Sequence, residues 1–223
     1  MIIRVTNLRG VFIMLLNSIS EWSFTVEKVK SIEARAVRSL GLSITNLMER
    51  ASEAVWKEVE RKFGVPREIT IFCGSGNNAG DGYLVAALAA AKSVRVTIIE
   101  VGARQKQNAE VVHARSIAAK LAVDFNSLDI EFKIKDGVII DALIGTGLRN
   151  KMGSNYAEAI EIINESKVPV VAIDVPSGLD ANTGDVPDLA VKADLTVTCV
   201  ALKRGMMTGK ASAYCGEIVL DSL

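Results

Sequence analysis

Three short segments of this sequence combine glycines with side chains that can bind polar ligands or move protons. They are GSGNNAGDG at residues 74–82, DALIGTGLRNK at residues 141–151 and DVPSGLDANTGD at residues 174–185. Each follows a short apolar run that is typical of a buried β-strand. Because the carboxyl ends of parallel strands lie at one edge of a sheet, the three segments are expected to meet there and form a ligand site.

The first segment opens an alanine-rich helical stretch and is typical of a ligand-binding loop. Its glycines let the backbone approach a ligand closely, and the amide groups at a helix N-terminus favour anions. Its G-x-G-x-x-x-G spacing misses the dinucleotide fingerprint by one residue, although Glu100 could imitate the ribose-binding acid of that motif. A tight strand-to-helix turn without a ligand is the alternative, but it leaves Asn77, Asn78 and Asp81 unexplained.

The second and third segments each begin with an aspartate at the end of a predicted strand. Asp141 precedes Gly145–Gly147, whose amide groups could form a phosphate-binding nest, and Lys151 adds a positive charge. Asp174 precedes Pro176–Gly178, which turn the chain. Each aspartate, taken singly, could instead be an ordinary turn residue.

One oxygen-bearing side chain comes from each segment: Asn78, Asp141 and Ser177. If their oxygens meet, the site holds one carboxylate and several neutral oxygens. Mg²⁺ and Ca²⁺ usually recruit more carboxylates or substrate phosphates, so this set suits a monovalent cation better.

The elements around these segments predict an α/β fold. Short β-rich runs alternate with helical runs, which favours a parallel sheet covered by helices on both faces. Residues 24–63 predict two leading helices, with Thr25 as an N-cap and Gly41 as a stop. We therefore expect a three-layer αβα sandwich with a Rossmann-like, mostly parallel sheet and an N-terminal helical pair. The predicted strands are 69–73, 94–100, 137–141, 168–174, 194–200 and 216–220, and the later helices are 81–92, 108–120 and 155–166.

Length and composition describe an ordinary globular domain. The chain has 223 residues, 49% of them apolar and 23% charged, and its 26 basic residues balance its 26 acidic ones. This balance predicts no nucleic-acid partner and no membrane partner. The apolar run at residues 11–16 is too short to span a bilayer. Residues 1–21 are therefore predicted to be an N-terminal extension, or an edge strand, before a domain at residues 22–223.

The cysteines and the histidine carry no recognisable motif. Cys73, Cys199 and Cys215 contain no C-x-x-C pair, so neither a disulfide framework nor a zinc site is predicted, and a reducing cytoplasm is the simplest compartment. His113 lies in a helical stretch and is interpreted as a residue of that helix.

The glycine-rich strings resemble the YjeF N-terminal family, the NAD(P)H-hydrate epimerases. The resemblance rests on GSGNNAGDG, DALIGTGL and AIDVPSGLDANTG, on the opening VEKVKSIEARAVRSLGLSITNLMERAS, and on ADLTVTCVALKRGMMTGKASAYCGEIVLDSL near the end. It covers about residues 22–221, and it identifies residues 22–223 as a YjeF N-terminal domain. It implies an isomerase that interconverts the R and S forms of hydrated NADH and NADPH (NADHX and NADPHX).

Other functions stay open beside this one. A non-catalytic nucleotide-binding or partner-binding YjeF-type module is the main alternative, but it would be expected to have lost Asp174 or the Asn77–Asn78 pair. An ordinary nicotinamide oxidoreductase or a sugar-kinase-like enzyme is a weaker alternative, and the glycine spacing argues against the oxidoreductase.

The resemblance also assigns roles to matching residues. Asp174 is expected to act as the catalytic base or proton shuttle, and Asn78, Asp141 and Ser177 to hold one potassium ion. The family implies a homodimer and a separate NAD(P)HX dehydratase as functional partner. This sequence departs from the family pattern at Ala79, Arg50 and Ser52, where Gly, Asn and Gly are usual. The expected contacts of the hydrated nucleotide are Asn77, Asn78, Ala79, Gly80, Asp81, Gly145, Thr146, Gly147, Leu148, Arg149, Asn150, Lys151 and Asp174.

Overall fold

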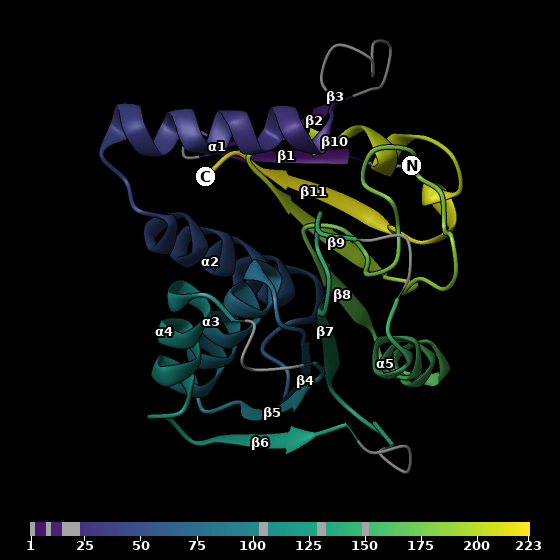
Figure 1. Cartoon of the computed structure of the whole chain (residues 1–223). Helices are drawn as coiled ribbons and strands as arrows, with labels where there is room; N and C mark the ends of the chain where they lie inside the picture. The colour runs from purple at the N-terminus through teal and green to yellow at the C-terminus, as the bar shows by residue number, and fades with distance from the viewer. Residues whose placement is uncertain (1–2, 8–9, 15–22, 103–106, 129–132, 149–151) are drawn as a thin grey trace.

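A nine-stranded sheet forms the centre of the molecule (Figure 1). The computed structural model describes residues 3–7, 10–14, 23–102, 107–128, 133–148 and 152–223. The strand order is β2-β1-β11-β9-β8-β7-β4-β5-β6, and every neighbouring pair is parallel except β1–β2. The strands are β1 Ile3–Asn7, β2 Gly10–Met14, β4 Glu68–Cys73, β5 Arg95–Glu100, β6 Val123–Ser127, β7 Val138–Ala142, β8 Val170–Ile173, β9 Leu195–Cys199 and β11 Glu217–Asp221.

Five α-helices pack around this sheet, and their ends follow the expected capping chemistry. Thr25 caps the first helix by accepting a hydrogen bond from the amide of Lys28, and Gly41 ends it with a positive φ. Ser43 and Asn46 form a reciprocal capping box at the second. The helices are α1 Val26–Leu40, α2 Ile44–Phe63, α3 Asn77–Ala91, α4 Ala109–Ala118 and α5 Ser154–Glu165.

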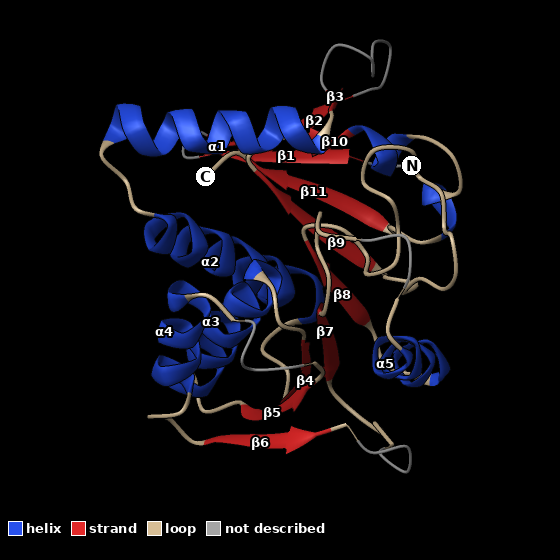
Figure 2. Ribbon diagram, in the orientation of Figure 1, coloured by secondary structure: helices blue, strands red, loops and turns tan. Residues whose placement is uncertain are grey.

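The helices divide between the two faces of the sheet (Figure 2). Helices α2, α3 and α4 cover one face, where Ile71, Ile98 and Ile140 belong to their core. Helix α5 covers the other face, where Phe72 and Ile139 point. Next to α5, the connection after β8 and two 3-10 turns (Arg204–Met207 and Ala211–Ala213) pack on the same side. The predicted three-layer α/β sandwich is confirmed.

The chain reverses its direction of travel across the sheet between β4 and β7. From β4 it moves outward to β5 and β6, and then returns to place β7, β8, β9 and β11 on the other side of β4. In open α/β sheets such a switch point opens a crevice at the carboxyl ends of the strands. The two segments that follow β4 and β7 are the glycine-rich segments singled out in the sequence.

The described N-terminal residues form strands at the edge of the sheet, which was one of the alternatives for residues 1–21, and the structure adds further elements that the sequence patterns did not predict. The described part of residues 1–21 forms the β1–β2 hairpin, and β1 joins the sheet through β11. The side chain of Arg4 forms an ion pair with buried Glu58 of α2. A separate two-residue ladder pairs β3 (Ser23–Phe24) with β10 (Leu202–Lys203). None of the described helices combines the length and the apolar character needed to cross a membrane.

Candidate active site

The three glycine-rich segments meet at the carboxyl edge of the sheet, as predicted. The amide of Gly74, just after β4, donates to the carbonyl of Ala142 at the end of β7, at 3.1 Å. A Cβ atom at Gly74 would collide with the carbonyl oxygen of Leu143, so only glycine allows this approach. The hydroxyl of Ser177, after β8, lies between the amide and the carbonyl of Ile144, at 2.8 and 3.0 Å.

Asp141 is the buried carboxylate of this edge. It is 0% exposed, and Ser177 donates to it twice, from the hydroxyl at 2.6 Å and from the amide at 2.8 Å. The amide of Leu143 donates to it at 3.2 Å. Burial raises the pKa of Asp141 to about 6, and the hydrogen bonds from Ser177 and Leu143 oppose that rise.

Asn78 approaches the same place from the first turn of α3. A Cβ atom at Gly145 would lie 3.2 Å from Oδ1 of Asn78 and 3.4 Å from Oδ2 of Asp174. Gly145 therefore lies against both side chains, and the lack of a side chain there leaves room between them. The Nδ2 atom of Asn78 is buried and has no hydrogen-bond partner among the described residues.

Asp174 follows β8 in a strained backbone turn. Its φ is 68°, and the amide of Val175 donates to the carbonyl of Ile173 across it, which defines a γ-turn. Val200 follows the neighbouring strand β9 in the same way, with φ 68° and a bond from the amide of Ala201 to Cys199. A non-glycine residue in this region costs about 1–3 kcal/mol and is frequent at functional sites. The two adjacent strands thus end in matching turns.

Lys203 holds the carboxylate of Asp174. The lysine is 1% exposed, whereas the aspartate side chain is 21% exposed. The Nζ atom forms a close ion pair with Oδ1 of Asp174 and donates to the hydroxyl of Thr198 and the carbonyl of Cys199, both at 2.9 Å. Thr198 donates in turn to the same oxygen of Asp174, at 3.2 Å.

Two further carboxyl groups share this electrostatic environment. Burial raises the pKa of Asp81 well above its usual range, the charges of Asp174 and Glu33 raise it further, and Lys203 opposes the rise. Burial also raises the pKa of Glu33 on α1; Lys203 and Lys30 oppose that rise, and Asp174 adds to it. The site therefore combines one carboxylate paired with a lysine and two carboxyl groups whose pKa values are raised chiefly by burial.

Comparison with known proteins agrees with this geometry. Residues 44–205 match the family described as YjeF-related protein N-terminus. The chain belongs to this family. A relative from Limosilactobacillus reuteri (strain ATCC 55730 / SD2112), named NAD(P)H-hydrate epimerase, is 34% identical over 88% of this chain and 92% of its own length. The crystal structure of yeast ynu0 superposes with a TM-score of 0.72 at 20% identity, covers 83% of both chains, and supports the fold.

Other relatives are longer proteins. Bifunctional NAD(P)H-hydrate repair enzymes Nnr from Coxiella burnetii and from Escherichia coli are 39% and 35% identical, over 88% and 92% of this chain. This chain spans 40% of the length of each of them.

The substrate residues that the YjeF family assigns to the first segment occupy the first turn of α3, and not a loop. Asn77 is exposed and its Oδ1 accepts from Nδ2 of Asn108 at 2.7 Å. Ala79 is fully buried, so its extra methyl group packs in the core and does not face a loop. A Cβ atom at Gly80 would lie 2.5 Å from the side chain of Met48, so this glycine allows α2 to approach α3. Of these five residues, only Asn78 and Asp81 have polar side chains near Asp174.

The second YjeF segment is described only in part. Gly145 and Thr146 are half-buried, Gly147 is exposed and Leu148 is half-buried. The predicted contacts Arg149, Asn150 and Lys151 lie outside the described residues.

The structure also shows the surroundings of several other residues that were interpreted from the sequence. Glu100 does not imitate a free ribose-binding acid, because Tyr83 and Arg115 donate to it at 2.9 and 2.6 Å. Ser52 is buried on α2, and its hydroxyl reaches the carbonyls of Met48 and Asp81, at 2.8 and 3.1 Å. This departure from the YjeF pattern thus links α2 to α3, whereas Arg50 is exposed and His113 is an exposed residue of α4.

The sequence interpretation missed two residues of the site. Lys203 lies in the run VALKRGMM, where a lysine beside apolar residues signals a buried charge. Glu33 occupies a position where the apolar periodicity of α1 is interrupted, which is the signal for a carboxyl group on a packed face.

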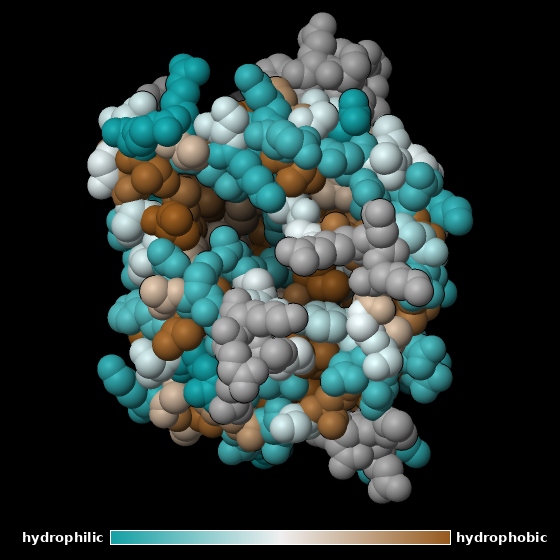
Figure 3. All heavy atoms as spheres, viewed as in Figure 1, coloured by the Kyte–Doolittle hydropathy of each residue, from teal (hydrophilic) through white to brown (hydrophobic). Residues whose placement is uncertain are grey.

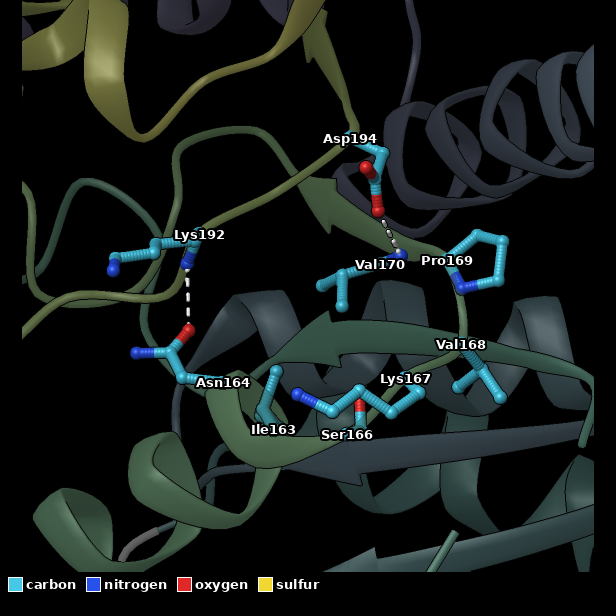
Figure 4. A pocket seen from close by; sticks show the side chains of 9 residues that line it. All are labelled: Ile163, Asn164, Ser166, Lys167, Val168, Pro169, Val170, Lys192 and Asp194. Carbon is cyan, nitrogen blue, oxygen red and sulfur yellow. Dashed lines mark hydrogen bonds between the residues drawn. The ribbon is translucent and has the colours of Figure 1, made fainter. Parts of the chain in front are cut away.

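A cavity of about 310 Å³ lies at the opposite edge of the sheet, at the amino ends of β8 and β9 (Figure 4). Asp194 there accepts from the amide of Val170, and Asn164 accepts from the amide of Lys192, both at 2.8 Å. These polar groups connect backbone segments. The Asp174–Lys203 pair and buried Asp141 lie at the carboxyl edge instead.

Proposed function

We propose that this protein is an NAD(P)H-hydrate epimerase that interconverts the R and S forms of NADHX and NADPHX. The observation that carries the proposal is the arrangement of Asp174. One carboxylate oxygen is held by Lys203 and Thr198, and the other lies beside Gly145 and near Asn78, where a substrate group can reach it. The relatives named for NAD(P)H-hydrate chemistry support the same conclusion.

The substrate chemistry inverts one carbon by moving protons at the oxygen and the nitrogen that are bonded to it. The hydrated nicotinamide ring carries a hydroxyl beside its nitrogen, which makes a hemiaminal. In one route Asp174 takes the hydroxyl proton, the carbon–nitrogen bond opens to an aldehyde, and the nitrogen takes up a proton. Ring closure on the other face of the aldehyde returns both protons and inverts the centre. Loss and re-addition of water is the other route.

Asp81 completes this acid–base pair. Burial raises the pKa of Asp81, and a carboxyl group with a raised pKa suits the role of a general acid. General acid–base assistance is worth typically about 10²–10⁴-fold in rate. No C–H bond has to be broken in this reaction, so we propose that such assistance supplies the catalysis.

The described residues fit a potassium ion. Asp141 is a buried carboxylate that pairs with no lysine or arginine in the described part of the chain, and Ser177 and Asn78 add neutral oxygens. Asn78, Asp141 and Ser177 would hold the ion. When bound it would supply one positive charge that fixes the three segments for nucleotide binding. One carboxylate with two neutral oxygens is a low charge for a divalent ion, which supports a monovalent ion.

An epimerisation assay tests the function. Purified protein is mixed with R-NADHX and a dehydratase that accepts only the S form, and the return of NADH is followed. We expect the R form to be consumed at a rate that depends on the protein concentration. A rate equal to spontaneous epimerisation would overturn the proposal. The non-catalytic binding module is not favoured, because Asp174 and the Asn77–Asn78 pair are all present.

We also propose that two copies of the protein associate through α1. Leu40 at the end of α1 and Ile44 at the start of α2 are apolar residues that are 68% and 50% exposed. Figure 3 shows apolar atoms gathered where α1 ends and α2 begins, beside a hollow. Replacing both residues by Glu is expected to give monomers in sedimentation experiments. Val112→Glu on α4 is the control, because Val112 is 53% exposed on another surface.

The cellular setting follows from the reaction. The S epimer of the proposed reaction would be the substrate of an NAD(P)HX dehydratase, an activity that we propose as the functional partner. Three buried, unpaired thiols agree with a reducing compartment, and we propose the cytoplasm.

A further inference from the structure

Lys203 is a buried cation whose three ammonium protons are all engaged in hydrogen bonds. The ammonium group has three donors, and they meet three acceptors: Asp174, Thr198 and Cys199. Burial of a lysine is costly unless it is paired and hydrogen-bonded, and here both conditions are met. The lysine therefore has no proton left for a substrate.

These three bonds connect two strained parts of the backbone. Cys199 and Asp174 belong to the matching γ-turns at the ends of β9 and β8. The lysine accordingly fixes the side chain of one turn against the carbonyl of the other. Its own backbone is held by the short ladder with β3, where Lys203 pairs with Phe24.

The two oxygens of Asp174 are used differently as a result. Oδ1 receives both Lys203 and Thr198, whereas Oδ2 has no hydrogen-bond partner among the described residues and lies toward Gly145. Rotation of the carboxylate would break both bonds to Oδ1. The other titratable groups around Asp174 are Asp81 from α3 and Glu33 from α1, whose pKa values are raised by burial and lowered by Lys203.

We propose that Lys203 is a positioning residue, which orients the carboxylate of Asp174 so that Oδ2 faces the substrate. This inference rests on the proposed epimerase function. It predicts that loss of the ammonium group lowers kcat and leaves KM nearly unchanged, because Lys203 acts through Asp174 and does not contact the nucleotide. Loss of orientation by about 1 Å is worth about 100-fold in rate.

The principal test compares two lysine-to-methionine variants. Lys203→Met removes the ammonium group and keeps the apolar stem, and we expect kcat to fall about 100-fold with KM within about threefold. Lys62→Met is the matched control, since Lys62 on α2 also has a hydrogen bond to a carbonyl and an ion pair, with Asp194 and Glu217, away from the site. Equal kcat values for the two variants, or a rise in KM alone, would overturn the proposal.

Two further measurements test the proposal independently of whether Lys203→Met folds. If Lys203→Met does not fold, Thr198→Val removes the second bond to Oδ1 with little change of shape, and kcat is expected to fall about tenfold. In Lys203→Ala, ethylammonium is expected to restore part of kcat by filling the vacated space. Unchanged kcat in Thr198→Val would contradict the positioning role.

A crystal structure separates this proposal from the proposed function. In Lys203→Met, or in Thr198→Val if the first variant does not fold, we expect a rotated Asp174 carboxylate. An unchanged orientation would overturn the positioning role whatever the enzyme does. If the wild-type protein fails to epimerise R-NADHX, the proposed function fails, and the orientation of Asp174 still decides this inference.

Discussion

Two aspartates at the ends of neighbouring strands, Asp141 after β7 and Asp174 after β8, have different surroundings. Asp141 is completely buried and receives only neutral hydrogen-bond donors, from Ser177 and Leu143. Asp174 is partly exposed, lies in a strained turn and is paired with a buried lysine. The same side chain at the same kind of position therefore has two states, a buried carboxyl group fixed by neutral donors and a lysine-paired carboxylate with one oxygen free, and we propose a different task for each.

The largest effect is expected from Asp174→Asn. Asparagine keeps an oxygen for Lys203 and Thr198 but cannot accept the substrate proton, so kcat should fall by about 100-fold or more. Nucleotide affinity should remain within about tenfold, because the amide has nearly the same shape. The variant also leaves the lysine without its counter-charge, so its melting temperature should fall. Single-turnover epimerisation per folded molecule measures the first effect, and wild-type turnover would show that another group is the base.

The proposed potassium site is tested by replacing the other aspartate of the comparison, in the variant Asp141→Ala. The wild-type protein is expected to melt at higher temperature as KCl replaces a larger cation such as tetramethylammonium, because an ion that binds the folded state stabilises it. Asp141→Ala should lose that shift and bind nucleotide more weakly, whereas Asp174→Asn should keep the shift. A KCl-dependent shift that survives in Asp141→Ala would exclude this cation site.

A smaller effect is expected for Asp81→Asn, which should raise the melting temperature instead of lowering it. The folded-state pKa of Asp81 is raised, so its carboxyl contributes stability below its ordinary pKa and loses that contribution as the pH rises through the folded pKa. Asparagine avoids this loss. The melting temperature of the variant should therefore exceed that of the wild type by a few degrees at pH 8, and the difference should shrink toward pH 4. Reduced turnover in the same preparation would show the cost of removing the acid.

The smallest effect is expected at the thiols. Burial raises the pKa of Cys73 and Cys199 well above the usual range and that of Cys215 to about 12, so few thiolates form. Although Cys199 lies beside Lys203, the lysine uses its carbonyl and not its sulfur. Exhaustive treatment of the native protein with a thiol reagent should leave activity intact. Inactivation that follows the modification of one cysteine, without unfolding, would show that a thiol takes part.

Much of this arrangement could be predicted from the sequence, because buried parallel strands are continuous apolar runs. The runs ending at Cys73, Asp141 and Asp174 placed three polar segments at one edge, and the structure brings Asp141 and Ser177 into direct contact. Strand β6, in contrast, is mostly exposed at the sheet edge, so its sequence VDFNS gives no apolar signal. The start of α3 was placed too late because NNAGDG contains poor helix formers, which are held in the helix by packing on Met48.

The roles of individual charges could not be predicted in the same way. The pairing of Lys203 with Asp174 depends on the turn after β9 and on the ladder with β3, which lie far apart in the sequence. Likewise, Gly80 and Ala79 looked like ligand-loop residues, but their positions on the inward side of α3 give them packing roles. Local sequence patterns predict the helices, the strands and the sheet edge at which polar segments meet. Contacts between distant segments decide which charged side chains pair with one another.

The ladder between β3 and β10 makes the assembly of the site depend on two segments that are far apart in the sequence. Ser23 is translated long before its partner Leu202. Contacts between such distant residues form slowly compared with local ones. A nascent chain that has stopped before residue 202 can already contain β4 to β8, yet Asp174 has no ammonium group to hold it. The Lys203–Asp174 pair can therefore form only after the segment that carries β10 has been made and has paired with β3.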